Sequence, residues 1–244
     1  GNDGLVLISR AGLTNLAITN MVGTNIIVTN TTFNTLGLIW TNLPSFTTNN
    51  LQGVAANGNL YVLCGGLGSI YTSSDGSNWT AQATPTTRFL SGIASFPGGW
   101  VAVGDQGTLL RAGPDAIDWT SLPTGTTNWF YRVRWVGNEL VVVGQNGLIY
   151  TSPDGTNWTF RTSGTSRWIN DVTFVDDTWF AAGTQGLLLS STNLVQWNVL
   201  SLPTIKSLFG ATSWDGQLIL AGIEGVILRN QVVPDSAPVD ILGY

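Results

Sequence analysis

Histidine is absent from this chain of 244 residues, and cysteine occurs once, as Cys64. Without histidine, the Ser-His-Asp and Cys-His nucleophile systems are excluded, and the commonest side-chain ligand of metal ions is missing. One cysteine excludes an intrachain disulfide and a zinc site made of thiolates. Because Cys64 ends an apolar run that begins at Leu60, we expect a buried thiol. The sequence therefore predicts no catalytic residues, no metal site and no cofactor.

Charged residues and long apolar runs are scarce as well. Charged residues make up 9% of the chain, and the formal net charge is -5. Since Lys and Arg form no run, we expect no nucleic-acid partner. Every apolar run is shorter than the ~18 residues that cross a bilayer, and no signal-peptide pattern begins the chain. We therefore expect a soluble chain without a membrane span.

The composition also bears on location. Gly1 in place of Met suggests a mature or excised portion, from which a targeting segment would have been removed. Thr, Asn, Ser and Gly are abundant while charge is low. Surfaces of this kind suit an extracellular or cell-surface protein, which is our expectation for this chain.

Tryptophan, in contrast, is abundant, with eleven residues, and five of them recur at nearly equal intervals. The intervals are 39, 40, 39 and 39 residues, between Trp40, Trp79, Trp119, Trp158 and Trp197. Self-similarity at one period means that one structural unit is copied and packs against its neighbours. Four strand-sized segments per ~40 residues is the period of a propeller blade.

Within each unit the strands and turns follow one order. The expected first strands are residues 91–95, 131–135, 170–174 and 209–213. A two-residue turn such as Asp215-Gly216 leads to a second strand that is apolar on both faces, as expected of a covered strand. A Gly-x-x-Gly turn follows, and no helix comes after it, so we read it as a tight turn rather than a phosphate loop. These glycine pairs are Gly65/Gly68, Gly104/Gly107, Gly144/Gly147, Gly183/Gly186 and Gly222/Gly225.

The turn before the tryptophan has its own signature. Residues 73–79 and 152–158 both read Ser-x-Asp-Gly-x-Asn-Trp, while Asn193 replaces the acid in the fourth full unit. A short acidic side chain caps such a turn through backbone N–H groups, and the tryptophan then inserts between neighbouring sheets. We therefore interpret these residues as structural. They are Asp75, Asp115, Asp154, Trp79, Trp119, Trp158 and Trp197.

These turns resemble the Asp-box of BNR-type β-propellers, which is found in sialidases and in photosystem II assembly factor-like proteins. The spacing here is one residue shorter than in the commonest form of the box, and the resemblance covers about residues 10–230. Sialidases use three arginines, a tyrosine nucleophile with a glutamate, and an acid/base aspartate. This chain lacks their Arg-Ile-Pro segment, and its glutamates, Glu139 and Glu224, pair with no recognisable tyrosine. The resemblance therefore implies the fold, while the missing catalytic residues argue against sialidase activity.

We expect one all-β domain over residues 1–244, a propeller of six blades with four antiparallel strands each, with seven as the alternative count. The last unit lacks the tryptophan, and either Leu5 to Ser9 or Val239 to Leu242 suits its outermost strand. Residues 1–9 are thus an extra strand that closes the last blade, thickens it, or exchanges between copies through its unpaired edge. The expected blades lie near residues 10–50, 51–88, 89–128, 129–167, 168–206 and 207–244.

A ring of equivalent positions precedes the first strands. Since first strands line the channel of a propeller, we expect these loops to gather cations and aromatic rings at one mouth. The photosystem II assembly factor-like resemblance implies a partner-binding surface there; the alternative is that the aromatics plug the channel and the cations cover them. The ring contains Arg88, Asn128, Arg167 and Lys206, with the aromatic residues Phe89, Trp129 and Trp168.

The sequence thus favours a non-enzymatic interaction or structural propeller whose partner is a protein or another copy of itself. A basic mouth on an acidic protein favours an anionic group, such as a peptide carboxylate. Two alternatives remain: a carbohydrate-binding or sialidase-like glycoside-processing propeller, and a photosystem assembly factor-like protein.

Overall fold

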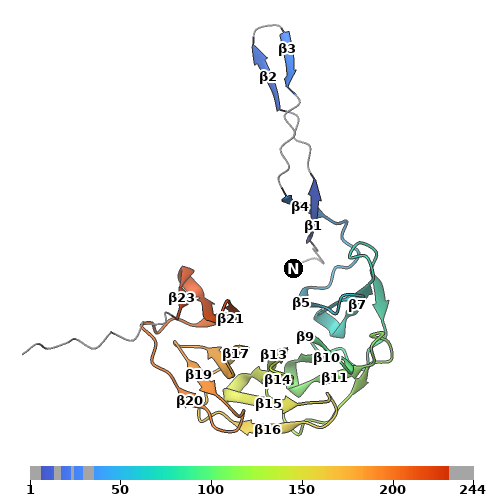
Figure 1. Cartoon of the computed structure of the whole chain (residues 1–244). Helices are drawn as coiled ribbons and strands as arrows, with labels where there is room; N and C mark the ends of the chain where they lie inside the picture. Colours follow the sequence, from blue (N-terminus) through green and yellow to red (C-terminus); the bar gives the residue numbers. More distant parts are fainter. Residues whose placement is uncertain (1–6, 14–17, 23–24, 30–35, 231–244) are drawn as a thin grey trace, which may run out of the picture.

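The computed structural model describes residues 7–13, 18–22, 25–29 and 36–230, and up to residue 42 it describes the backbone alone. Five antiparallel sheets stand side by side in an arc, each built from consecutive strands (Figure 1). The predicted all-β propeller fold is confirmed. The count of six blades stays a prediction.

Four of these sheets have four strands in sequence order. The first contains β5 (Leu51–Ala56), β6 (Tyr61–Gly65), β7 (Ile70–Ser73) and β8 (Thr80–Gln82). The second contains β9 (Leu90–Phe96), β10 (Gly99–Gly104), β11 (Leu109–Ala112) and β12 (Thr120–Ser121). The third contains β13 (Phe130–Val136), β14 (Glu139–Gly144), β15 (Leu148–Ser152) and β16 (Thr159–Thr162). The fourth contains β17 (Ile169–Val175), β18 (Thr178–Gly183), β19 (Leu188–Ser191) and β20 (Asn198–Val199).

The fifth sheet has three strands in the described residues, β21 (Leu208–Trp214), β22 (Gln217–Gly222) and β23 (Ile227–Arg229). The segment Val239 to Leu242, considered for its outermost strand, lies outside the described residues. Consecutive sheets contact one another through their first strands, β5 to β9, β9 to β13, β13 to β17 and β17 to β21. The first strands therefore form the inner wall of the arc.

The N-terminal strands pair differently from a blade. They are β1 (Leu7–Leu13), β2 (Ile18–Val22), β3 (Asn25–Thr29) and β4 (Leu36–Asn42). In a blade each strand pairs with the next, whereas here β1 pairs with β4 and β2 pairs with β3. These four strands thus pair in a nested order rather than as the four-stranded meander expected for a first blade over residues 10–50. Residues 1–6 of the expected extra strand lie outside the described residues.

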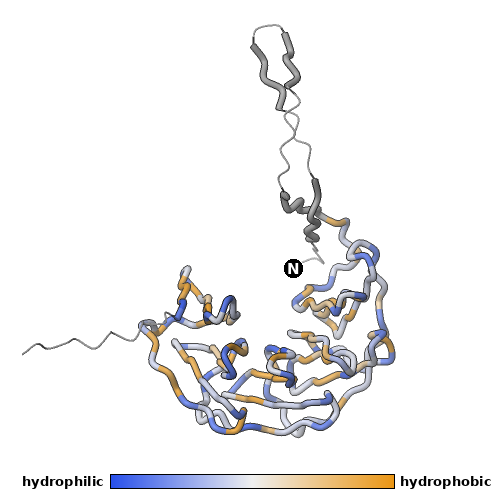
Figure 2. The backbone as a smooth tube through the Cα atoms, in the orientation of Figure 1, coloured by the Kyte–Doolittle hydropathy of each residue, from blue (hydrophilic) through white to orange (hydrophobic). Residues whose placement is uncertain are grey.

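Apolar side chains pack between the sheets instead of into one central core. Figure 2 shows apolar stretches spread along the whole arc. The three interfaces between the first four sheets each include the tryptophan of an Asp-box-like turn, namely Trp119, Trp158 and Trp197. Trp79 belongs to the first sheet and stacks instead on Phe46, with ring centroids 5.8 Å apart. Each interface is therefore wedged by an aromatic ring at its outer part.

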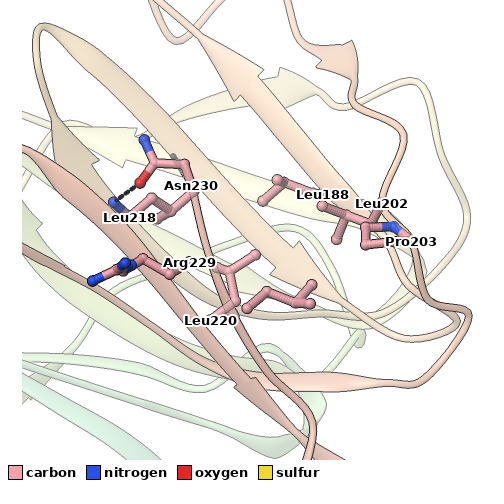
Figure 3. Close-up of a pocket in the computed structure, with 8 residues that line it drawn as sticks. Leu188, Leu202, Pro203, Leu218, Leu220, Arg229 and Asn230 are labelled. Atoms are coloured by element: carbon pink, nitrogen blue, oxygen red, sulfur yellow. Dashed lines mark hydrogen bonds between the residues drawn. The ribbon is translucent and has the colours of Figure 1, made fainter. Parts of the chain in front are cut away.

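The interface between the fourth and fifth sheets has no such tryptophan among the described residues. A cavity of 140 Å³ opens there (Figure 3). Leu188 and Leu202 line it from the fourth unit, and Leu218, Leu220 and Leu228 line it from the fifth. The last unit therefore packs less completely than the others because it lacks the aromatic wedge.

Glycine is required at two points of each Gly-x-x-Gly turn, for different reasons. Four of the five turns form short 3₁₀ segments: η2 (Gly66–Gly68), η3 (Asp105–Gly107), η4 (Gln145–Gly147) and η5 (Ile223–Gly225). A Cβ on Gly144 would lie 2.0 Å from the Trp129 carbonyl oxygen, so the first glycine allows close strand contact. Gly147 has a φ of +68°, which disfavours other residues. The tight-turn expectation therefore applies to the second glycine, while the first serves close packing.

The Asp-box-like turns are capped by their own acids. Asp154 Oδ1 accepts hydrogen bonds from the backbone N–H groups of Thr156 and Asn157, both at 2.8 Å. These bonds hold the pKa of Asp154 well below its usual range, and Asp75 shows the same shift for the same reason. Asn193 Oδ1 makes the equivalent bonds at 2.9 Å without a charge. The turn therefore needs a short side chain with an oxygen acceptor, and the negative charge is of secondary importance.

Candidate site at the channel mouth

The loops that enter the first strands share one hydrogen-bonded turn. In each loop a threonine hydroxyl accepts from the backbone N–H two residues later, for example Thr165 Oγ1 from the Arg167 N–H at 3.1 Å. The same bond fixes Arg88, Asn128 and Lys206, at 3.0 to 3.1 Å. The repeat therefore places these four residues at the same point of successive blades.

Three of these residues reach the Gly-x-x-Gly turn of the sheet whose first strand they precede. Asn128 Oδ1 accepts a hydrogen bond from Asn146 Nδ2 at 3.2 Å, and Arg167 Nη1 donates to the Gln185 carbonyl at 3.4 Å. Lys206 forms an ion pair with Glu224. Each side chain is thus held against the sheet that follows it in the chain, and the described contacts do not join the cations to one another. Because Glu224 neutralises Lys206, Arg88 and Arg167 are the cations of the ring that form no ion pair with a described carboxylate.

The structure does bring the predicted aromatic residues together. Phe89 and Trp129 lie edge to face with ring centroids 5.9 Å apart, and Trp129 and Trp168 follow at 6.1 Å. Tyr131 continues the line, 6.4 Å from Trp168. All four rings are half-buried. The mouth therefore presents a row of aromatic edges and faces across three neighbouring blades, a surface that stacks on planar or apolar groups.

Hydrogen bonds fix the middle of this row. The Trp129 backbone N–H donates to Gln145 Oε1 at 3.0 Å, and its indole N–H donates to Ser91 Oγ at 3.2 Å. Ser91 in turn donates to the Phe130 carbonyl at 2.6 Å. Because the ring is anchored at both its backbone and its nitrogen, the aromatic row is preorganised and needs little ordering on binding.

Sequence reasoning missed a charged cluster on the inner wall. Asp171 is buried and receives two hydrogen bonds from Arg134, at 2.9 and 2.7 Å. Arg132 Nε lies 3.7 Å from the same carboxylate, and the backbone N–H of Ala211 donates to it at 3.1 Å. The hydrogen bonds that Arg134 donates to the Asp171 carboxylate are the largest cause of a raised pKa of Arg134. One carboxylate therefore ties three blades together.

A signal for this cluster was present in the sequence. Arg132 and Arg134 are two residues apart on a strand and so share one face, the face of the inner wall. At the position of Arg132 and Asp171, the other first strands have Gly53, Gly92 and Gly210. Two arginines against one aspartate leave an excess positive charge on the first strands β13 and β17.

The described residues offer little for catalysis. Glu139 lies in the third sheet and Glu224 in the fifth, and burial raises the pKa of Glu139. Burial raises the pKa of the Cys64 thiol to about 12, which keeps it protonated and unreactive. No three His, Cys, Asp or Glu side chains in this part of the chain lie where they could hold a metal ion. Nor is any helix there long and apolar enough to span a membrane.

Comparison with known proteins places the chain among β-propellers by structure alone. Neither family models nor curated sequences match it. A structure described as YCF48 bound to D1 peptide superposes with a TM-score of 0.62 at 15% identity, covering 78% of this chain and 66% of that one. YCF48 from Cyanidioschyzon merolae gives a TM-score of 0.61 at 18% identity over 78% of this chain and 72% of that one.

The WD40 propeller domain of Doa1 is also similar, with a TM-score of 0.59 at 10% identity over 74% of this chain and 64% of that one. The chain thus spans just under two thirds of the length of the D1 peptide complex and of the Doa1 domain. At these identities the likeness defines the class, a β-propeller, and no narrower family.

Proposed function

We propose that this chain is a non-catalytic binding propeller whose channel mouth takes a protein or peptide segment that carries a carboxylate. The observation behind the proposal is the aromatic row from Phe89 to Trp168, flanked by Arg88 and Arg167, which form no ion pair with a described carboxylate. A planar guanidinium suits a carboxylate, and the rings suit the apolar side chains beside it. Similarity to a YCF48 structure with a bound D1 peptide supports a peptide ligand and the photosystem assembly factor-like alternative.

The test is a binding titration with peptide pairs that share one sequence and differ at the C-terminus, free acid against amide. A D1 peptide is included as one pair. We expect the free acid to bind at least ~10-fold more tightly than the amide, a preference that weakens as salt is added. In the double variant Arg88→Gln, Arg167→Gln the preference should vanish.

The matched control for these variants is Arg161→Gln. Arg161 lies in the outer strand β16 and donates to Thr151 Oγ1 at 3.0 Å, away from the mouth. The Arg161→Gln variant should keep the preference for the free-acid peptide over the amide. Equal binding of acid and amide by the unmodified protein would reject the carboxylate site. Loss of the preference in the Arg161 variant as well would mean that net charge, and not the mouth, recognises the peptide.

A carbohydrate ligand is the second candidate, because half-buried tryptophan faces such as that of Trp168 also stack on sugar rings. A glycan array with the Trp129→Ala and Trp168→Ala variants separates it from the peptide proposal. Secretion and self-assembly through a terminal strand are further proposals. Secretion rests on composition, and self-assembly rests on the edge of β23, which pairs with no further strand in the described residues. Molar mass in solution and localisation of the tagged protein test them.

A further inference from the structure

The arc of five sheets ends in two surfaces that are buried everywhere else in the repeat. Val54 on β5 is 66% exposed, whereas the aligned residues of the next four sheets pack into the preceding sheet. Those aligned residues are Ile93, Val133, Val172 and Ala211. The exposed face of β5 is therefore the face that should meet a preceding blade.

The other end of the arc shows the complementary pattern. Ile227 on β23 is 73% exposed, while the aligned residues Ile70, Leu109, Ile149 and Leu188 are buried against the following sheet. Trp214 is 78% exposed, whereas the aligned Phe96 and Val175 are buried and the aligned Val136 is half-buried. No interface joins the sheets of β5 and β21 in the described residues (Figure 1). Among the described residues, a vacant sector thus separates the two ends of the arc. Each end gives this sector one apolar wall, of the kind that elsewhere forms an interface between blades.

The ladder of β1 and β4 has the register of the outer half of a blade. Ile8 pairs with Thr41. Ile8 lies four residues after Gly4, and Thr41 lies one residue after Trp40. Thr151 and Thr159 pair in the same way after Gly147 and Trp158. Every four-stranded sheet shows this register between its third and fourth strands. We therefore assign β1 and β4 as a third and a fourth strand.

The segment that joins β4 to β5 supports the assignment. The Asn49 N–H donates to Thr47 Oγ1 at 3.1 Å, as in the loops between the other blades. A blade that ends in β4 would therefore lie next to β5, in the vacant sector. The inner half of that blade is not among the described residues, in which β1 pairs with β4 alone.

We propose that the vacant sector binds a β-hairpin from a partner protein, which supplies the first and second strands of a sixth blade beside β1 and β4. The free edge of β1 provides backbone hydrogen bonds, and the walls at Val54 and Ile227 provide apolar contacts. The hairpin must be apolar on both faces and its second strand must end in glycine. A Cβ at that glycine would clash with a backbone carbonyl, just as a Cβ on Gly104 would lie 2.0 Å from the carbonyl oxygen of Phe89.

The probe is a synthetic hairpin with the sequence of residues 208–222, which spans β21 and β22. The reporter is the full chain with Val54→Cys, labelled by a maleimide; Cys64 is buried and serves as the silent background. The matched control chain is Val172→Cys, at the aligned position buried between the third and fourth sheets. The control peptide has lysine in place of Leu218 and Leu220. Circular dichroism checks that both variants fold.

In the free protein, we expect the thiol of the Val54→Cys chain to be labelled at least ~10-fold faster than the introduced thiol of the Val172→Cys chain. Saturating hairpin should slow labelling of the Val54→Cys chain by at least ~10-fold, whereas the lysine peptide should leave the rate unchanged. The proposal is overturned if the hairpin does not slow labelling. It is equally overturned if the two introduced thiols react equally slowly without peptide, because the chain itself then fills the sector.

The same labelling experiment distinguishes the occupants of the sector. If the Val54→Cys thiol becomes protected from labelling as the protein concentration rises, and a dimer forms with it, the sector binds a second copy. That result would reject the partner hairpin. None of these results depends on the carboxylate site at the channel mouth, so the two proposals can fail separately.

Discussion

Asp171 shows how a single buried charge links the repeat units. Its carboxylate accepts from Arg134 of the preceding blade and from the Ala211 backbone of the following blade. Removing one partner of a buried ion pair leaves an uncompensated charge and usually costs several kcal/mol. The surrounding arginines are partly exposed, at 31% and 42% of their side chains, so water compensates some of that loss.

We predict that Asp171→Asn lowers the free energy of unfolding by about 2 kcal/mol, measured by urea denaturation. The amide keeps one hydrogen-bond acceptor but loses the charge that faces two arginines. Asp177→Asn, in the exposed turn after β17, is the control and should change stability by less than about 0.5 kcal/mol. A value for the Asp171 variant that matches the control would show that the arginines are fully hydrated.

The capping aspartates predict an acid dependence of stability. Asp75 and Asp154 have pKa values below the usual range because backbone N–H groups bind their ionised forms. A group with a lowered pKa in the folded state stabilises fully above its unfolded pKa of about 3.9, and this contribution is lost as the pH falls below that value. We expect the melting temperature to fall below about pH 4, and the Asp75→Asn, Asp154→Asn variant to show a shallower fall. Parallel curves for the two proteins would rule out this origin.

At the scale of elements, the fifth sheet differs from the others by what its interface lacks. Leu228 lines the cavity of 140 Å³, and the aligned residue of the third sheet is Tyr150. Tyr150 donates its hydroxyl to the Thr124 carbonyl at 3.1 Å, and the residue aligned with Thr124 is Leu202, which also lines the cavity. A tyrosine at position 228 therefore has both space and an acceptor.

We predict that Leu228→Tyr stabilises the protein by about 1 kcal/mol, which raises the melting temperature by about 2 to 4 °C. Ile227→Tyr is the matched control: its side chain points to the exposed end of the arc, so it should give no gain. A lower melting temperature for the Leu228 variant would mean that the fifth sheet is too rigid to admit the ring.

The elements of the repeat were predictable from sequence because their signals are local. The apolar run that ends at Gly144 gives β14, and the Asp-box-like turns fall between third and fourth strands as expected. The pairing of β1 with β4 was missed because β2 and β3 lie between them in the sequence. In the other units, the two strands that pair in this way follow one another directly. The Asp171 cluster was missed because its partners lie in different units, 37 residues away for Arg134. Local patterns do not encode such contacts between repeats.

For the whole molecule, an arc of repeats has a different stability profile from a closed ring. Each sheet gains its stability from two neighbours, so a sheet at an open end has one interface fewer. In the part of the chain that the structure describes, the sheets of β5 and β21 are such ends, and their outward faces expose Val54 and Ile227. The central sheet, from β13 to β16, is covered on both sides.

We therefore predict that native-state hydrogen exchange is graded along the arc. The amides of Leu140 to Val143 in β14 should exchange most slowly, because they open only with the whole molecule. The amides of β22 and β6 should exchange at least ~10-fold faster through opening of one end. Uniform protection across β6, β14 and β22 would contradict an open arc and would mean that a sixth blade closes the ring in solution. Adding the hairpin of residues 208–222 should slow exchange in β6 and β22 and leave β14 unchanged, which connects the stability profile to the vacant sector.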